Sequence, residues 1–539
     1  MERIEGNIVD IHRRRIFPGA LVMDDGYIRS IEETAGPYDT YIAPGFVDAH
    51  VHIESSMLLP AEFGRMVAAR GTVAVITDPH EIANVAGVAG VEFMLQRAAE
   101  APIGIYFTVP SCVPATPFDC SGGHIPVTDV ESLLDSGRFV ALSEVMDVPA
   151  VLGGDREMQR KLSAALRRGL PIDGHAPCLA GLDLRRYVAA GISTDHECTS
   201  LEEAVEKAEA GMYILIRQGS AAQNYEALRE MLTRYPDRVM FCTDDAHPDD
   251  ILAHGHIDRL VCRAVADGYD LFDVLRAASL HPVCHYGLDT GLLRVGDRAD
   301  FCLFPDLHTF RPQAVYVGGN RVYPLSGKQP ARPGIGAFGP FCCGGITAES
   351  LRRPCRKGAL SCIGIRPNEI LTQHLSFPIA EDLPNMESDL QRDILKLVYL
   401  NRYTPGSTPR VAYLHGLGLR RGALASSVAH DSHNIIAAGC SDREIARAIG
   451  EVAAHRGGLA LVLGEEVHSL PLPIGGLMSE ASAEETAAKW SLLNALLKEN
   501  GCRLHAPFMT LSFMSLLVLP ELKIGERGLF DYSRFNFLE

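Results

Sequence analysis

The sequence predicts an α/β protein: a (β/α)8 TIM barrel, a flanking small β-sandwich built from both sides of the barrel segment, and a C-terminal α+β domain. Three observations lead to this prediction. Short apolar runs rich in β-branched residues alternate with helical patterns through the middle of the chain. Segments of short strands and turns lie on both sides of that stretch. A stretch rich in Gly and Pro then separates it from the remaining residues.

The barrel rests on eight expected strands, several of which are followed by a clear helical pattern. The strands are expected at residues 42–47, 72–77, 103–109, 139–143, 170–173, 191–195, 212–217 and 238–243. Helices are expected at residues 155–168, 181–190, 201–210 and 225–235. Eight strand–helix units over this length fit a barrel whose active site lies at the C-terminal ends of the strands.

The flanking segments define the other expected domains. Residues 1–41 and 291–325 have the pattern of short strands and turns, with a hairpin signal at 24–27, and we expect them to pair into one small β-sandwich. The barrel is expected to span residues 42–290. Residues 326–345 are expected to form a linker, and residues 346–539 a separate α+β domain.

The charge balance limits the partners of the protein. The chain has 539 residues and a net charge of −17, from 67 acidic and 50 basic side chains. Such a surface argues against tight binding to a nucleic-acid backbone or an anionic membrane, but not against a free nucleobase, which carries no phosphate. No signal peptide is visible, the apolar run at 511–519 is too short to span a bilayer, and the 14 cysteines form no Cys-x-x-Cys motif. We therefore expect a cytoplasmic protein with reduced thiols.

Polar residues follow the expected strands, at the edge where a barrel carries its active site. The segment 43–54 has the pattern of a buried strand that ends on His50 and His52, which point the same way because side chains alternate along a strand. A single His-x-His pair is more often two polar residues at a strand end. Other residues favour a functional site here, because later strands also end in histidines or carboxylates: Glu144, His175, His196 and Asp244.

Four imidazoles and two carboxylates at one edge predict a metal site. Six protein ligands can serve two divalent cations if one carboxylate bridges them, and Glu144, placed between the two His pairs in strand order, is the expected bridge. Two cations that share a water would give hydroxide at neutral pH. Asp244 is expected to ligate one cation and to accept the proton of the attacking water, although the adjacent Asp245 could take this place.

These residues and their order resemble those of a known family. The segment Pro-Gly-Phe-Val-Asp-Ala-His-Val-His at 44–52, the strand order of the expected ligands and the flanking sandwich resemble the amidohydrolase superfamily. Three barrel segments resemble, more narrowly, the bacterial adenine deaminase family: 50–56, 77–84 and 242–248. The resemblance continues beyond the barrel at residues 429–434, 473–478, 511–514 and 520–522. It therefore covers nearly the whole chain.

The resemblance implies an enzyme of purine salvage that hydrolyses adenine to hypoxanthine and ammonia, with a metal-activated hydroxide attacking C6 of the purine. It also implies two divalent ions per chain, Mn²⁺ or Fe²⁺, and the ligands would accept Zn²⁺ as well. An acid that protonates a ring nitrogen would help this reaction. Glu81 and Glu197 each follow a histidine at a strand end and are candidates for that acid, although each could instead cap a helix or support a ligand. We expect a homo-oligomer.

Two other functions compete with this one. A cyclic-amide hydrolase of the same barrel type would bridge its metals with a carbamylated lysine on strand four, but residues 139–147, which carry Glu144, contain no lysine. A non-catalytic assembly protein on the same barrel would lack the metal ligands. Outside the barrel, the spacing of His430 and His433 would place both on one face of a helix, and they either approach the active site or pack at an interface.

Overall fold

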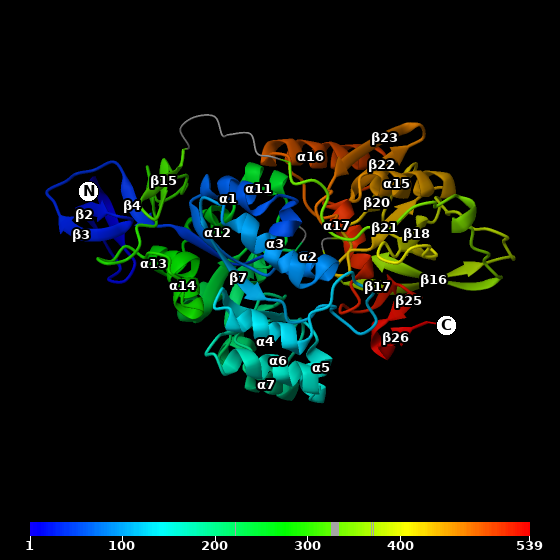
Figure 1. The fold of residues 1–539 in the computed structure, drawn as a ribbon, viewed down its shortest axis with the longest axis horizontal. Helices are drawn as coiled ribbons and strands as arrows, with labels where there is room; N and C mark the ends of the chain where they lie inside the picture. The colour runs from blue at the N-terminus through cyan, green and yellow to red at the C-terminus, as the bar shows by residue number, and fades with distance from the viewer. Residues whose placement is uncertain (221, 325–333, 368, 370, 539) are drawn as a thin grey trace.

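The computed structural model describes every residue except 221, 325–333, 368, 370 and 539 (Figure 1). Its centre is a barrel of eight parallel strands, paired in chain order in a group of five and a group of three. They are β5 (Phe46–Val51), β6 (Thr72–Thr77), β7 (Gly104–Val109), β8 (Phe139–Val145), β9 (Ile172–Gly174), β10 (Thr194–Asp195), β11 (Tyr213–Arg217) and β12 (Val239–Cys242).

Backbone hydrogen bonds join the two groups of strands into one barrel. Between β9 and β10, the N–H of Ser193 donates to the carbonyl of Ile172 at 2.9 Å. Between β12 and β5, the N–H of Asp244 donates to the carbonyl of His50, also at 2.9 Å. Strands β5, β6 and β12 are buried at every residue, because the barrel interior covers one face and helices cover the other. The predicted barrel is confirmed.

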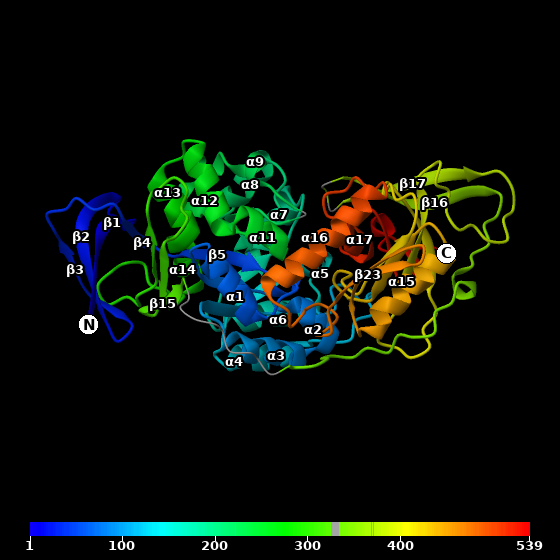
Figure 2. The same ribbon diagram turned by 90° about the horizontal axis from the view of Figure 1, so that it is seen from above.

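Helices surround the barrel (Figures 1 and 2). They are α1 (Pro60–Ala68), α2 (His80–Ala86), α3 (Val88–Ala98), α4 (Val127–Asp135), α5 (Val148–Gly153), α6 (Arg156–Leu166), α7 (Gly181–Ala189), α8 (Leu201–Glu209), α9 (Tyr225–Leu228), α10 (Met231–Arg234), α11 (Pro248–His254), α12 (Ile257–Ala266), α13 (Leu271–Leu275) and α14 (His281–Tyr286). The helix expected at 225–235 is divided into α9 and α10. At the break, the N–H groups of Leu232 and Thr233 donate three residues back, to Arg229 and Glu230, which tightens the turn.

Strands from both sides of the barrel segment pair with one another and form one seven-stranded sheet. Its order is β15 (Asn320–Tyr323), β14 (Ala314–Val317), β13 (Phe301–Phe304), β4 (Tyr41–Pro44), β1 (Glu2–Asp10), β2 (Arg15–Asp24) and β3 (Tyr27–Glu33). Strands β4 and β13 run antiparallel, with Phe301 opposite Pro44. The chain thus leaves this sheet to build the barrel and returns to it directly afterwards.

The first barrel strand differs from the prediction. The sequence indicated one strand at 42–47, but the chain divides at Gly45, so that β4 joins the seven-stranded sheet and β5 joins the barrel. Pro44 has no N–H with which to continue a ladder. A Cβ at Gly45 would overlap the side chain of Val73. The division therefore requires a residue without a side chain where the two sheets meet.

The C-terminal region, residues 346–538, is built on an eight-stranded sheet. Its order is β17 (Thr372–Ile379), β16 (Gly358–Ile365), β19 (Arg410–His415), β18 (Ile394–Leu400), β21 (Ile435–Gly439), β20 (Ala423–Ser426), β22 (Gly458–Leu463) and β23 (Glu466–Pro471). A smaller sheet joins β24 (Leu522–Gly525), β25 (Gly528–Asp531) and β26 (Asn536–Phe537). The helices of this region are α15 (Asp442–Ala454), α16 (Ala483–Glu499) and α17 (Pro507–Ser512).

The C-terminal region packs directly on the barrel. In both ribbon views α16 and α17 lie between the barrel and the eight-stranded sheet. His247, at the start of α11, stacks on Trp490 of α16 with ring centroids 4.3 Å apart. Of the linker expected at 326–345, residues 326–333 lie outside the described residues. No described helix is both long and apolar enough to cross a bilayer.

Candidate active site

The six residues singled out at the strand ends lie together on one side of the barrel. We call this group the barrel edge, and all of its side chains are buried. Each follows or ends a strand, because the carboxyl ends of parallel strands meet on one side of a barrel. The members of the barrel edge are His50, His52, Glu144, His175, His196 and Asp244.

Glu144 lies between two pairs of imidazoles. Its Oε1 atom is 3.8 Å from Nε2 of His50 and 3.3 Å from Nε2 of His52. Its Oε2 atom is 2.8 Å from Nδ1 of His175 and 3.4 Å from Nε2 of His196. Each carboxylate oxygen therefore faces one pair of histidines. Burial acts to raise the pKa of Glu144, but the hydrogen bonds from His175 and His196 outweigh it and hold this pKa well below its usual range.

Asp244 faces the first histidine pair from the other side of the barrel edge. Its Oδ1 atom is 3.6 Å from Nε2 of His50 and 3.2 Å from Nε2 of His52. Its Oδ2 atom accepts a hydrogen bond from Nη1 of Arg217 at 2.5 Å. The backbone of Asp244 makes two hydrogen bonds to the first barrel strand and the residue after it. Its N–H donates to the carbonyl of His50, and its carbonyl accepts from the N–H of His52 at 3.2 Å. Its carboxylate is thus fixed by both backbone and side-chain contacts.

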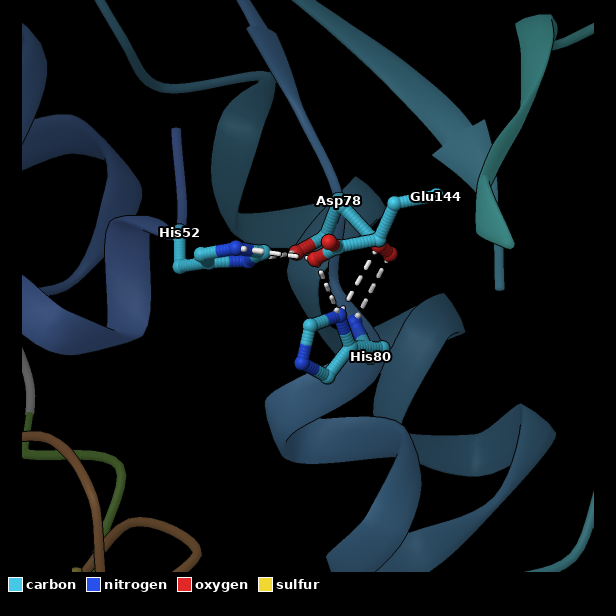
Figure 3. A group of neighbouring side chains, drawn as sticks. All are labelled: His52, Asp78, His80 and Glu144. Carbon is cyan, nitrogen blue, oxygen red and sulfur yellow. Dashed lines mark hydrogen bonds and ion pairs between the residues drawn. The ribbon is translucent and has the colours of Figure 1, made fainter. Parts of the chain in front are cut away.

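The segment from the end of β6 to the first residue of α2 adds two residues that the sequence did not single out, Asp78 and His80. Figure 3 shows Asp78 and His80 turned toward His52 and Glu144. Nδ1 of His80 lies 2.8 Å from Asp78 Oδ2 and 3.5 Å from Glu144 Oε1. Nδ1 of His52 lies 3.1 Å from the carbonyl of Asp78. The signal that could have found them is the Asp-Pro-His segment at 78–80, directly after a buried strand.

The donor atoms of the barrel edge suit divalent cations. Groups that could hold a metal ion include His52, Asp78, His80 and Glu144, then His50, His196 and Asp244, and also Glu144, His175 and His196. Among the described residues, Nε2 of His50 and Nε2 of His175 are buried and have no hydrogen-bond partner. Buried polar atoms of this kind are normally satisfied. Imidazole and carboxylate are common ligands of first-row transition metals. The residues therefore fit a metal centre.

Glu197 is held in an ion pair. Nη1 and Nη2 of Arg217 lie 2.5 and 3.1 Å from its two carboxylate oxygens. Burial opposes the charge of Glu197, but Arg217 outweighs this effect and lowers the pKa of the carboxyl well below its usual range. Arg217 thus links Glu197 to Asp244 across the barrel edge, because its one guanidinium group pairs with both carboxylates.

Glu81 lies in the first turn of α2, where the barrel meets the C-terminal region. Its Oε1 atom is 2.8 Å from Nδ1 of His430 and 3.5 Å from Nε2 of His80. Its other oxygen contacts Nε2 of His433. The sequence left open whether His430 and His433 approach the site, and the structure places both against Glu81. They lie on a loop and not on a helix.

A small cavity opens over the barrel edge, and the C-terminal region supplies one of its walls. From the barrel it is lined by His52, His80, Glu81, Glu144, Met146, His175, His196, Glu197, Arg217, Ala222, Asp244 and Asp245. From the C-terminal region it is lined by His430, Asp431, Phe513, Leu516 and Leu519. Asp245, the alternative to Asp244, therefore also faces the cavity, and its Oδ1 atom accepts a hydrogen bond from Ser55 Oγ at 2.5 Å. The cavity therefore has a polar side from the barrel and a partly apolar side from the C-terminal region.

Comparison with known proteins agrees with this architecture. The amidohydrolase family matches residues 41–322, and the adenine deaminase C-terminal domain matches residues 369–536. A more distant similarity in structure is found to N-acetyl-D-glucosamine-6-phosphate deacetylase from Mycobacterium smegmatis, with 16% identity and a TM-score of 0.46 over 60% of this chain and 100% of that one. The two family matches together account for the barrel, part of the flanking sheet and most of the C-terminal region.

Curated relatives match over the full length. A protein named adenine deaminase from Sulfurovum sp. (strain NBC37-1) is 47% identical over 99% of this chain and 99% of its own. Another protein of this name, from Methanosarcina mazei, is 45% identical over 100% of this chain and 99% of its own. The chain therefore belongs to the amidohydrolase family and, within it, to the adenine deaminases. The two competing functions, a cyclic-amide hydrolase and an assembly protein, are not favoured.

Proposed function

We infer that the protein deaminates adenine by hydrolysis: adenine and water give hypoxanthine and ammonia. The observation that carries this inference is the full-length similarity to proteins named adenine deaminase, which includes the C-terminal region as well as the barrel. The site supports it, because a buried cavity lined by both acidic and basic groups can move protons during attack on a purine.

The proposed cofactor is a pair of divalent cations, Mn²⁺ or Fe²⁺, with Zn²⁺ as a third candidate. When bound, such ions make water more acidic and stabilise negative charge on the reacting oxygen. The six residues of the barrel edge would hold these ions, and Glu144 would be shared by both. The support for Glu144 in this place is that each of its two oxygens faces a different pair of histidines.

Asp244 is the proposed base that accepts a proton from the attacking water. It lines the cavity, and Arg217 holds its Oδ2 atom so that the carboxylate keeps one orientation. Arg217 also favours the ionised form of Asp244, which is the form that can accept a proton. General base catalysis of this kind contributes about 10²–10⁴-fold in rate.

The acid that protonates the purine ring is proposed to act from the Glu81 side of the cavity. Glu81 and Glu197 both line the cavity. Glu197 is paired with Arg217, and this pairing opposes protonation of its carboxylate. Glu81 is instead hydrogen-bonded to the imidazole of His430, a group that can carry a proton. Because His430 and His433 hold the pKa of Glu81 well below its usual range, we place the proton of this acid on the pair of Glu81 and His430, and not on Glu197.

An ultraviolet assay of the metal-loaded protein with adenine, adenosine and cytosine tests the proposed function. We expect conversion of free adenine and almost none of adenosine, because the C-terminal region adds a wall to the small cavity that would leave little room for a ribose. Comparable turnover of adenosine, or a preference for cytosine, would contradict the proposal. A role in purine salvage, a cytoplasmic location and a homo-oligomeric state stay predictions, to be checked by growth on adenine, by fractionation and by light scattering.

A further inference from the structure

The loop 429–434, which we call the C-terminal loop, brings an imidazole to the cavity from outside the barrel. His430 lies in this loop, is buried and lines the cavity. Its Nδ1 atom is 2.8 Å from Glu81 Oε1. Within the described part of the chain, its Nε2 atom is buried and has no hydrogen-bond partner. The Nδ1 atom is therefore held by a carboxylate, while the Nε2 atom is available to a molecule bound in the cavity.

Contacts to both the ring and the backbone hold His430 in place. Its ring stacks on Phe513, with centroids 5.2 Å apart and planes 25° apart. Its carbonyl accepts a hydrogen bond from Ser515 Oγ at 3.3 Å. Glu81, which holds Nδ1, is itself contacted through its other oxygen by His433. A carboxylate that holds one nitrogen of a histidine fixes the ring and favours its protonated form.

We propose that His430 is a catalytic residue which donates a proton from Nε2 to a ring nitrogen of the substrate, with Glu81 as the residue that positions it. This inference rests on the proposed adenine deamination and assigns its acid step. Glu81 then serves the reaction through His430, and the C-terminal region becomes part of the catalytic apparatus as well as a wall of the cavity.

Asp244 and His430 together account for every proton that moves in the reaction. The oxygen of water forms a bond to C6 while one of its protons passes to Asp244. The electron pair of the C6–N1 double bond moves to N1, which takes the proton from His430 Nε2. The bond between C6 and the amino nitrogen then breaks, and ammonia leaves with the proton held by Asp244. The remaining hydroxyl proton is released to restore His430, which leaves a C6 carbonyl and a proton on N1 in hypoxanthine.

The charges around His430 favour its protonated form at neutral pH. Burial opposes the charge, but the carboxylates of Glu81, Asp245 and Asp431 outweigh it and raise the pKa of His430 to about 9. The other imidazoles that face it are those of His433 and His247, and the pKa of each is lowered to about 4, mainly by burial. An acid step that needs protonated His430 is available below pH 9 and is lost as the pH rises through this value.

The test compares His430→Asn with His415→Asn in the full-length, metal-loaded protein. His415 is a matched control, because its ring also packs against a phenylalanine of the C-terminal region, Phe377, with ring centroids 5.3 Å apart and planes tilted by 31°. We expect His430→Asn to lose about 10²–10⁴-fold in kcat while keeping its metal content and melting temperature, and added imidazole to restore part of the rate. The control is expected to keep the kcat of the unchanged protein.

A second variant tests the positioning role with His430 still in place. Glu81→Gln removes the carboxylate that favours the protonated imidazole, so the alkaline limb of the pH–rate profile is expected to move down by about one pH unit or more. The proposal is overturned if His430→Asn keeps near-normal kcat, if its loss of rate matches a loss of metal, or if Glu81→Gln leaves the alkaline limb in place. Failure of the unchanged protein to deaminate adenine would instead overturn the proposed function.

Discussion

The barrel edge and the C-terminal loop face each other across one cavity, but different interactions position their side chains. At the barrel edge, strand register and burial place the side chains, as with Glu144 in β8. The loop is held by side chains behind it: Arg402 donates to the carbonyls of His433 and Gly475, and Asn434 donates to the carbonyl of Cys120 in the barrel at 2.6 Å. Regular structure thus builds the metal-binding side, and a network of hydrogen bonds builds the facing wall.

The largest expected difference between the two sides appears when metal is removed. A chelator should abolish deamination, and added Mn²⁺ should restore it at about two ions per chain, because the barrel edge offers ligands for two. The C-terminal loop should keep its place, since Asn434 and Arg402 hold it without metal. Elemental analysis together with the rate checks this prediction. Full activity with one ion or none would show that the two-ion assignment is wrong.

Glu144→Ala should act almost as strongly as chelation. Without Glu144, two cations would face each other with less negative charge between them, so at least one should be lost. Metal content and turnover should therefore fall together, while circular dichroism stays that of a folded protein. Glu202→Ala, at an exposed position in α8, is the matched control and should change neither quantity. If Glu144→Ala keeps two ions, its bridging role is excluded.

Asp244→Asn should separate metal binding from proton transfer. The amide keeps an oxygen that can ligate, but it cannot accept the proton of water. Metal content should largely survive, while turnover falls by about 10²–10⁴-fold. The same substitution at Asp245, which also lines the cavity, should cost far less. Near-normal turnover in Asp244→Asn, with a collapse in Asp245→Asn, would move the base to Asp245.

Arg402→Leu should affect the wall and leave the barrel edge intact. The Arg402 side chain is fully buried, and its loss leaves the carbonyls of His433 and Gly475 without this donor. An unsatisfied buried acceptor costs about 1–3 kcal/mol, so thermal unfolding should shift to lower temperature. Metal content should stay the same, and turnover should fall less than in Asp244→Asn. Arg420→Leu, at an exposed position in the same region, is the control.

The sequence predicted which six side chains lie together at the barrel edge, because the signals for them are local. A buried apolar run followed by His or a carboxylate is visible within a few residues, and parallel strands bring such ends together. The approach of His430 to Glu81 joins segments far apart in the chain, and no local pattern specifies such a contact. The same limit explains the first strand, since the division at Gly45 depends on Val73, which lies on the adjacent strand β6.

The pairing of Phe301 with Pro44 also has a consequence for how the chain is made. A ribosome delivers β1 to β4 first, but β13, the neighbour of β4 in the finished sheet, emerges only after all eight barrel strands. Until then one side of β4 stays open, and an open strand edge invites pairing with other chains. The seven-stranded sheet can therefore be completed only after the barrel segment has been made, and until then its half-built form carries an open edge.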